Sequence, residues 1–273
     1  MREIILQALK KAVEEYPEIK DYLKGDARLI ANIYAYKIGE SPDDAQRIED
    51  EIKLARSMGS FLGWQLEYII REIRKYKGHL PFNFWETMRL RMFNEIGDNF
   101  IGIMVHGVDG GIWAMGAGTS GYVNRDNMNI SLINYARRYK NDWLSYINNT
   151  TRDFVETSIA DWMNSGESID KLVRSLRDST MFDKVRAQRI AVTEVTRLYA
   201  MGNQAVWEAS KIIDLFTWMT ANDERVCELC GPNEGKQFPL SELSNLIPAH
   251  VNCRCWGTPV VNLEKLKESY DWS

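Results

Sequence analysis

PAHVNCRC, residues 248–255, and CELC, residues 227–230, decide how the last part of this sequence is expected to fold. Together they hold all four cysteines and one of the three histidines of a 273-residue chain. So many sulfur and nitrogen donors in so short a region have four explanations: a bound metal, a pair of disulfides, a nucleophile with its base, or chance.

The spacing of these donors is typical of a structural zinc site. A two-residue gap lets both sulfurs of a CxxC turn reach one ion, and a second arm about twenty residues later completes the ligand shell. Thiolates with an imidazole favour zinc over magnesium or calcium. Because zinc takes four ligands, one of the five donors is spare. We expect the ligands to be Cys227, Cys230, His250 and Cys253, with Cys255 as the alternative to His250 or Cys253.

Disulfides are disfavoured by the expected compartment. The N-terminal stretch lacks the apolar core of a signal peptide, and no segment approaches the roughly 18 apolar residues that suggest a membrane helix. We therefore expect a reducing cytoplasm and no membrane partner. A redox pair and a catalytic pair of His250 with Cys253 stay open, although closeness in sequence is not what catalysis requires and no orienting third group is evident.

A structural role is expected for the zinc ion. Four protein ligands close the site, whereas a catalytic site keeps one position open for water. Five candidate donors favour closure, and a tail of about sixty residues with few strongly apolar runs needs a staple. No catalytic residue is therefore expected.

Composition is that of a soluble globular protein, with 45% hydrophobic and 26% charged residues. The net charge of −4 argues against a dedicated nucleic-acid binder, which usually carries a strong basic excess. A small basic cluster, Arg137, Arg138 and Lys140, fits either a solvated helix face or a DNA contact. Direct DNA binding therefore stays open.

The hydrophobic pattern predicts a mainly α fold with a helical N-terminal half. Helical periodicity runs through residues 1–100, where Ser41 and Pro42 are typical of a helix start. The glycine-rich residues 101–124 lack a phosphate-loop or dinucleotide fingerprint and are interpreted as a flexible connector or short hairpins. Aromatic residues of this half are expected in the core or between helices: Trp64, Tyr68, Phe82, Phe84 and Trp85.

Long helices are also expected in the second half, over residues 127–163 and 183–210. Between them, Gly166 suits a left-handed helix end and Ser168 can start a shorter helix. Strands at 214–220 and 255–262 would complete a small α+β module stapled by zinc. The predicted domains are a helical region at 1–125 with its glycine-rich connector, a domain at 126–261 with the zinc module at 212–261, and a tail at 262–273.

Three stretches give a combined pattern: RAQRIAVTEVTRLYAMGNQAV from residue 186, WMTANDERVCELC from residue 218, and PAHVNCRC from residue 248. The pattern resembles the phage head morphogenesis family, the minor head proteins of the phage Mu F and SPP1 gp7 type. The resemblance covers about residues 125–261. The matching pieces are Arg186-Ala187, Ile190-Ala191, Thr193-Glu194, Trp218, Asp223, Arg225-Val226-Cys227, Cys230, Gly235, His250 and Asn252-Cys253-Arg254-Cys255.

The resemblance implies a non-enzymatic minor capsid protein of the virion. Such proteins are typically bound to the portal during head assembly in the host cytoplasm and can stay with the packaged DNA until ejection. The implied partners are the portal protein and, as further candidates, the major capsid or scaffolding protein. The implied location is the capsid interior or the portal vertex.

Glu194 supports an alternative function. It shares a helix face with apolar residues, where a carboxylate is costly unless paired. The simpler interpretation is a salt bridge to Arg186, Arg225 or Arg254, and Asp223 is expected to be a turn residue or an arginine partner. The alternative interpretation is a zinc-dependent hydrolase that uses Glu194 as its general base.

Overall fold

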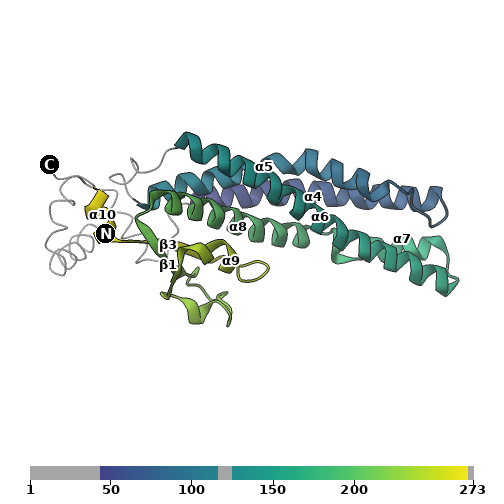
Figure 1. Cartoon of the computed structure of the whole chain (residues 1–273). Coiled ribbons are helices and arrows are strands. Elements are labelled where there is room, and N and C mark those ends of the chain that lie inside the picture. Colours follow the sequence, from purple (N-terminus) through teal and green to yellow (C-terminus); the bar gives the residue numbers. More distant parts are fainter. Residues whose placement is uncertain (1–43, 116–124, 270–273) are drawn as a thin grey trace. The chain divides into compact units, whose positions relative to one another are not determined.

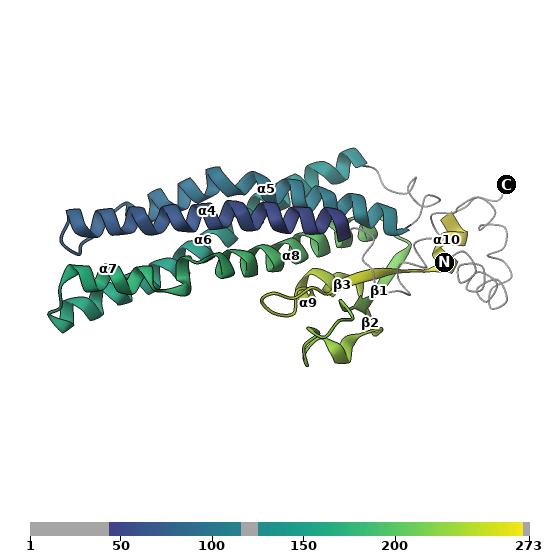
Figure 2. The same ribbon diagram turned by 180° about the vertical axis from the view of Figure 1, so that it is seen from behind.

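The computed structural model of the chain describes residues 44–115 and 125–269 (Figures 1 and 2). Long helices dominate this part, and a small antiparallel sheet lies near its C-terminal end, which confirms the predicted fold class. In these two ranges, no helix combines the length and apolar character needed to cross a membrane. The main elements are α4 (Asp44–Lys75), α5 (Phe84–Met115), α6 (Arg125–Ser165), α7 (Ile169–Arg177), α8 (Lys184–Ser210), β1 (Ile213–Met219), β2 (Gln237–Pro239), α9 (Leu243–Leu246), β3 (Trp256–Val261) and α10 (Leu263–Ser269).

The chain divides into two compact units that interleave along the sequence, so that α4, α5, α6 and α8 each contribute to both. The domain boundaries expected from the sequence stay predictions. The first unit takes α4 as far as Ile48, α5 from Ile103, α6 as far as Leu132 and the chain from Val195 onward, and the second takes Glu49–Gly102 and Ile133–Glu194.

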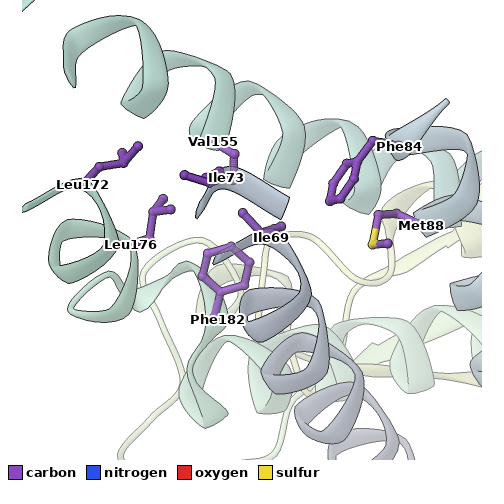
Figure 3. Close-up of a cluster of buried hydrophobic side chains, with 8 residues drawn as sticks. All are labelled: Ile69, Ile73, Phe84, Met88, Val155, Leu172, Leu176 and Phe182. Carbon is purple, nitrogen blue, oxygen red and sulfur yellow. The ribbon is translucent and has the colours of Figure 1, made fainter. Parts of the chain in front are cut away.

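The second unit has an apolar core to which α4, α5, α6 and α7 all contribute (Figure 3). Leu172 and Leu176 lie one helical turn apart on α7 and are both buried, as their spacing requires. Gly166 takes a φ of 67°, which is the left-handed conformation expected after α6. The buried members of this core are Ile69, Ile73, Phe84, Met88, Val155, Leu172, Leu176 and Phe182.

The aromatic residues of α4 and α5 pack as expected, with one exception. The rings of Trp64 and Tyr68 lie 5.1 Å apart, those of Tyr68 and Phe84 5.5 Å, and those of Phe84 and Trp85 5.0 Å. The prediction for Phe82 was wrong, because its side chain is fully exposed. Phe82 lies in the loop that joins α4 to α5, before the periodic packing face of α5 begins.

Residues 101–115 are helical, so the prediction of a flexible connector or hairpins was wrong over this range. Glycines on α5 and on α8 allow these two helices to approach each other closely within the first unit. A Cβ atom on Gly107 would lie 2.8 Å from the Tyr199 Cα, and one on Gly202 would lie 2.7 Å from the Met104 carbonyl oxygen. These glycines therefore serve packing between backbones rather than flexibility. Residues 116–124 lie outside the described part.

The three-stranded sheet has the order β2-β1-β3, with both pairs antiparallel. Phe216 and Trp218 of the central strand are buried, and the alternating residues Leu215 and Thr217 are more exposed, as strand alternation predicts. Gly257 of β3 packs closely, because a Cβ atom there would lie 2.6 Å from Leu243 Cδ1 of α9. The strands expected from the sequence are thus β1 and β3, while the three-residue β2 was not predicted.

Two sequence features lie outside the described residues. Ser41 and Pro42, expected to start a helix, precede the first described residue. The side chains of Arg137, Arg138 and Lys140 are also outside the described part, although their backbone belongs to α6.

Phe82 and Phe84 offer a matched test of this fold. Replacing Phe84 by alanine removes a buried ring from the core, so we expect a loss of about 3–5 kcal/mol in the free energy of unfolding. The same change at exposed Phe82 should alter it by no more than about 0.5 kcal/mol. Chemical denaturation of the two variants checks this, and equal losses would contradict the placement of Phe82.

The glycine contact between α5 and α8 is tested by Gly202→Ala. The new methyl group would meet backbone atoms, so we expect destabilisation of about 1–3 kcal/mol. Gly102 on α5 is the matched control. A Cβ atom there meets nothing within 4 Å, so Gly102→Ala should stabilise the protein by about 0.5–1 kcal/mol. Opposite shifts of the denaturation midpoint are the expected result.

Candidate metal centre

The first donor arm is a tight turn after β1. The amides of Cys230 and Gly231 both donate hydrogen bonds to the Cys227 carbonyl, at 3.1 and 2.9 Å. This turn brings the two sulfurs of the CxxC stretch to the same side of the chain. Cys230 is buried and Cys227 is partly exposed, so one donor faces the protein interior and the other lies nearer solvent.

The second arm presents His250 with a defined tautomer. The His250 Nδ1 lies 2.8 Å from the Val251 carbonyl oxygen, which can only accept a hydrogen bond, so Nδ1 carries a proton. The same contact raises the pKa of His250, with smaller contributions from nearby thiolates against the effect of burial. In the neutral ring Nε2 is then free of its proton. A histidine that binds a metal commonly donates its other N–H to a carbonyl in this way.

The donors of the two arms meet within the first unit. The His250 Nε2 lies 3.1 Å from the Cys227 sulfur and 3.2 Å from that of Cys230, and the Cys230 and Cys253 sulfurs lie 3.9 Å apart. Neighbouring donors of a tetrahedral zinc ion are separated by about 3.5–3.8 Å. Cys227, Cys230 and His250 form one group of neighbouring donors and Cys230, Cys253 and Cys255 form another, so the cluster around Cys230 could hold a metal ion.

Cys255 differs from the other thiols in its contacts. It belongs to a second buried group with Cys230 and Cys253. A hydrogen bond from Cys255 is the main reason why the pKa of Cys253 is lowered to about 5, and the same bond, together with burial, raises the pKa of Cys255. Cys255 therefore keeps its proton and donates it to the Cys253 thiolate. Which of the five donors is spare stays a prediction.

Cys230 needs a nearby positive charge to ionise. Burial raises its pKa to about 12, so the thiol stays protonated at neutral pH unless a cation compensates. For Cys227, hydrogen bonds from its own turn overcome the opposing effect of burial and lower the pKa. A metal ion bound here would supply the missing charge at Cys230 and displace its proton.

A charged cluster ties the two arms together beside the donors. Arg254 donates one hydrogen bond of 2.7 Å to each carboxylate oxygen of Asp223, and Arg225 donates to the same carboxylate at 3.2 and 3.4 Å. The bond from Arg254 is the main cause that holds the pKa of Asp223 well below its usual range. Asp223 precedes the first arm and Arg254 lies in the second, so the fork fixes one arm against the other.

Glu194 and Arg186 belong to the second unit, and their geometry is local to it. The buried Glu194 accepts a hydrogen bond of 2.6 Å from the Tyr139 hydroxyl. Arg186 donates to the Thr151 hydroxyl at 3.1 Å and to the Met181 carbonyl at 2.6 Å, and burial lowers its pKa. The sequence analysis missed Tyr139 as a partner of Glu194. The salt bridges and the general-base role expected for Glu194 stay predictions.

The sequence analysis also missed a contact between α8 and the second arm. The Thr196 hydroxyl donates to the Cys253 carbonyl at 2.9 Å and accepts from Arg47 Nη2 at 2.6 Å.

Comparison with known proteins gives one match. The family model described as "Phage Mu protein F like protein" matches residues 153–257, a range that includes α7, α8, β1, β2 and all five donors. It confirms the resemblance noted from the sequence. Neither the curated proteins nor the solved structures include a significant match to the chain.

Serine variants separate bound donors from the spare one. We expect Cys230→Ser to lower zinc affinity by more than the roughly 10- to 100-fold that loss of an outer-shell partner costs, because it removes the donor common to both groups. Cys255→Ser keeps a hydroxyl that can still donate to Cys253, so its loss should stay within about tenfold. Competition with a chromophoric chelator measures both, and equal losses would make Cys255 a ligand.

Proposed function

We propose that the chain is a minor head protein of a phage, carried in the virion, because the Phage Mu protein F like family model matches residues 153–257. The family is one of phage head morphogenesis, which is a structural rather than a catalytic task. The proposed partner is the portal protein, with the major capsid or scaffolding protein as further candidates. The proposed role lies in head assembly or in delivery of the DNA.

The chemical part of the proposal is a structural zinc ion held by Cys227, Cys230, His250 and Cys253. The observation that carries it is the meeting of both arms, with His250 Nε2 within 3.2 Å of the sulfurs of Cys227 and Cys230. Four protein donors leave no position for a water nucleophile. This closure favours a staple over the alternative zinc hydrolase that would use Glu194 as general base.

The staple has a clear physical task in the proposed fold. The region after α8 contains three short strands and a four-residue helix, and segments of this size bury little apolar surface. A metal ion that joins two arms about twenty residues apart would add its binding free energy to folding, because the unfolded chain rarely presents a preformed site. In this assignment residues 212–261 form the zinc module, residues 1–125 dock on other head proteins and residues 262–273 are a tail.

Packaged DNA would lie near the protein without a need for tight binding. The net charge of −4 supports contact with other proteins more than with phosphates. The roles of Glu194, Arg186, Asp223, Arg225 and Arg254 in this proposal are structural. The fork from Arg254 to Asp223 supports that assignment, since it joins the two zinc arms.

The proposal is tested on particles of the phage that encodes the chain. Mass spectrometry of purified, protease-treated heads should find the protein inside wild-type particles, since an interior protein is shielded. A deletion mutant should yield fewer infectious particles and be rescued by the wild-type gene. Absence of the protein from finished heads would contradict the virion assignment.

The zinc part is tested separately on the purified chain. X-ray absorption at the zinc edge should show one zinc per chain, with three sulfur ligands, one nitrogen ligand and no water oxygen. A shell that includes a water-like oxygen would favour the hydrolase alternative instead. A chain that binds no zinc at all would remove both metal functions without affecting the virion assignment.

A further inference from the structure

We propose that Thr196 and Arg47 are positioning residues of the metal centre, and that they couple metal binding to the docking of the first turns of α4. The inference rests on the proposed structural metal and adds to it two residues outside both donor arms. Arg47, Thr196 and Cys253 all belong to the first unit. The hydrogen bonds that join them span 149 and 57 residues of sequence.

The direction of this relay is fixed by chemistry. A carbonyl oxygen only accepts and a guanidinium group only donates, so the single proton of the Thr196 hydroxyl goes to the Cys253 carbonyl while a lone pair accepts from Arg47. The two distances, 2.9 and 2.6 Å, are those of good hydrogen bonds. Thr196 therefore cannot be replaced by a residue that only donates or only accepts without loss of one contact.

Thr196 is distinguished from its neighbour Thr193 by where its hydroxyl points. The Thr193 hydroxyl donates to the Arg189 carbonyl four residues earlier in the same helix, at 2.7 Å, which is the common arrangement for a helical threonine. The Thr196 hydroxyl instead leaves its own helix and reaches the second donor arm. The two residues lie on one helix, so they make a matched pair for experiment.

Burial makes the relay strong. Arg47 is 6% exposed, Thr196 2% and Cys253 1%. A guanidinium group in such a place needs hydrogen-bond partners, and loss of the Thr196 hydroxyl would remove one of them. The relay holds the backbone of Cys253, whose sulfur lies 3.9 Å from that of Cys230. Loss of these two hydrogen bonds would therefore displace the backbone of Cys253, a proposed metal ligand.

Coupling follows from this arrangement. The metal orders the second arm, and the ordered arm presents the carbonyl to which Thr196 and Arg47 are joined. By thermodynamic reciprocity, whatever factor the relay adds to metal affinity, the metal adds to the docking of Arg47. The start of α4 and the metal centre thus stabilise each other, although 180 residues separate Arg47 from Cys227 in the sequence.

The experiment measures zinc affinity of the full chain by chelator competition. We expect Thr196→Val to weaken zinc binding by about 10- to 100-fold, the range for loss of an outer-shell partner. Thr196→Ser keeps the hydroxyl, so its zinc affinity should stay within about threefold of the wild-type value. Thr193→Val, with the same change of atoms on the same helix, should bind zinc as tightly as the wild type. Arg47→Met should weaken binding in the same direction as Thr196→Val, with exposed Arg56→Met as its control.

Reciprocity supplies a second readout that needs no variant. Chelation of zinc should speed amide hydrogen exchange in residues 45–50 of α4 as well as in the donor arms, even though α4 supplies no metal ligand. If Thr196→Val fails to fold, this exchange measurement on the wild-type chain still tests the coupling between the metal and α4. Unchanged exchange in residues 45–50 after chelation would overturn the coupling, as would equal zinc affinity in Thr196→Val and Thr193→Val.

Failure of the proposed metal gives a different result. If the wild-type chain binds no zinc, the structural metal itself is wrong. If the wild type binds zinc tightly and the Thr196 and Arg47 variants bind it equally well, the metal stands and only the positioning role is lost.

Discussion

The physical constraint on which the C-terminal module depends is the crowding of sulfur and nitrogen donors around Cys230. Its sulfur lies 3.9 Å from that of Cys253 and 3.2 Å from the His250 Nε2. Burial alone keeps the Cys230 thiol protonated, so these donors can bind as a set only if a cation compensates their charge. The tight CxxC turn, the Nδ1 contact of His250 and the fork between Asp223 and Arg254 all bring the arms to that place.

Helix packing in the first unit sets where the second arm can lie. The backbones of α5 and α8 approach closely at Gly107 and Gly202, which fixes the position of α8 beside α5. From α8, Thr196 then reaches the Cys253 carbonyl. The close helix contact at Gly107 and Gly202 therefore helps to position Cys253, a candidate metal ligand, through Thr196. The module is not simply appended to a helical protein, since helix and donor arm share hydrogen bonds.

The sequence predicted the elements whose signals are local. Regular apolar spacing indicated α6, α7 and α8, Gly166 marked a helix end, and the donor spacing indicated that the cysteines and His250 gather in one region. It failed at 101–115, where glycine was taken for flexibility but permits close helix contact, because the partner helix lies far along the chain. It missed the relay from Arg47 to Cys253 for the same reason. Phe82 was misplaced because a loop has no periodicity from which burial can be inferred.

The order of the donors along the chain has a consequence for biogenesis. Cys227 and Cys230 are synthesised before His250 and Cys253, and all the helices from α4 to α9 precede the last two donors. During translation the early CxxC turn can offer only two sulfurs to an ion, which is half of a zinc shell. The site is therefore completed late, after the long helices have been made. A metal ion held by donors of both arms would therefore require a chain translated through its second arm.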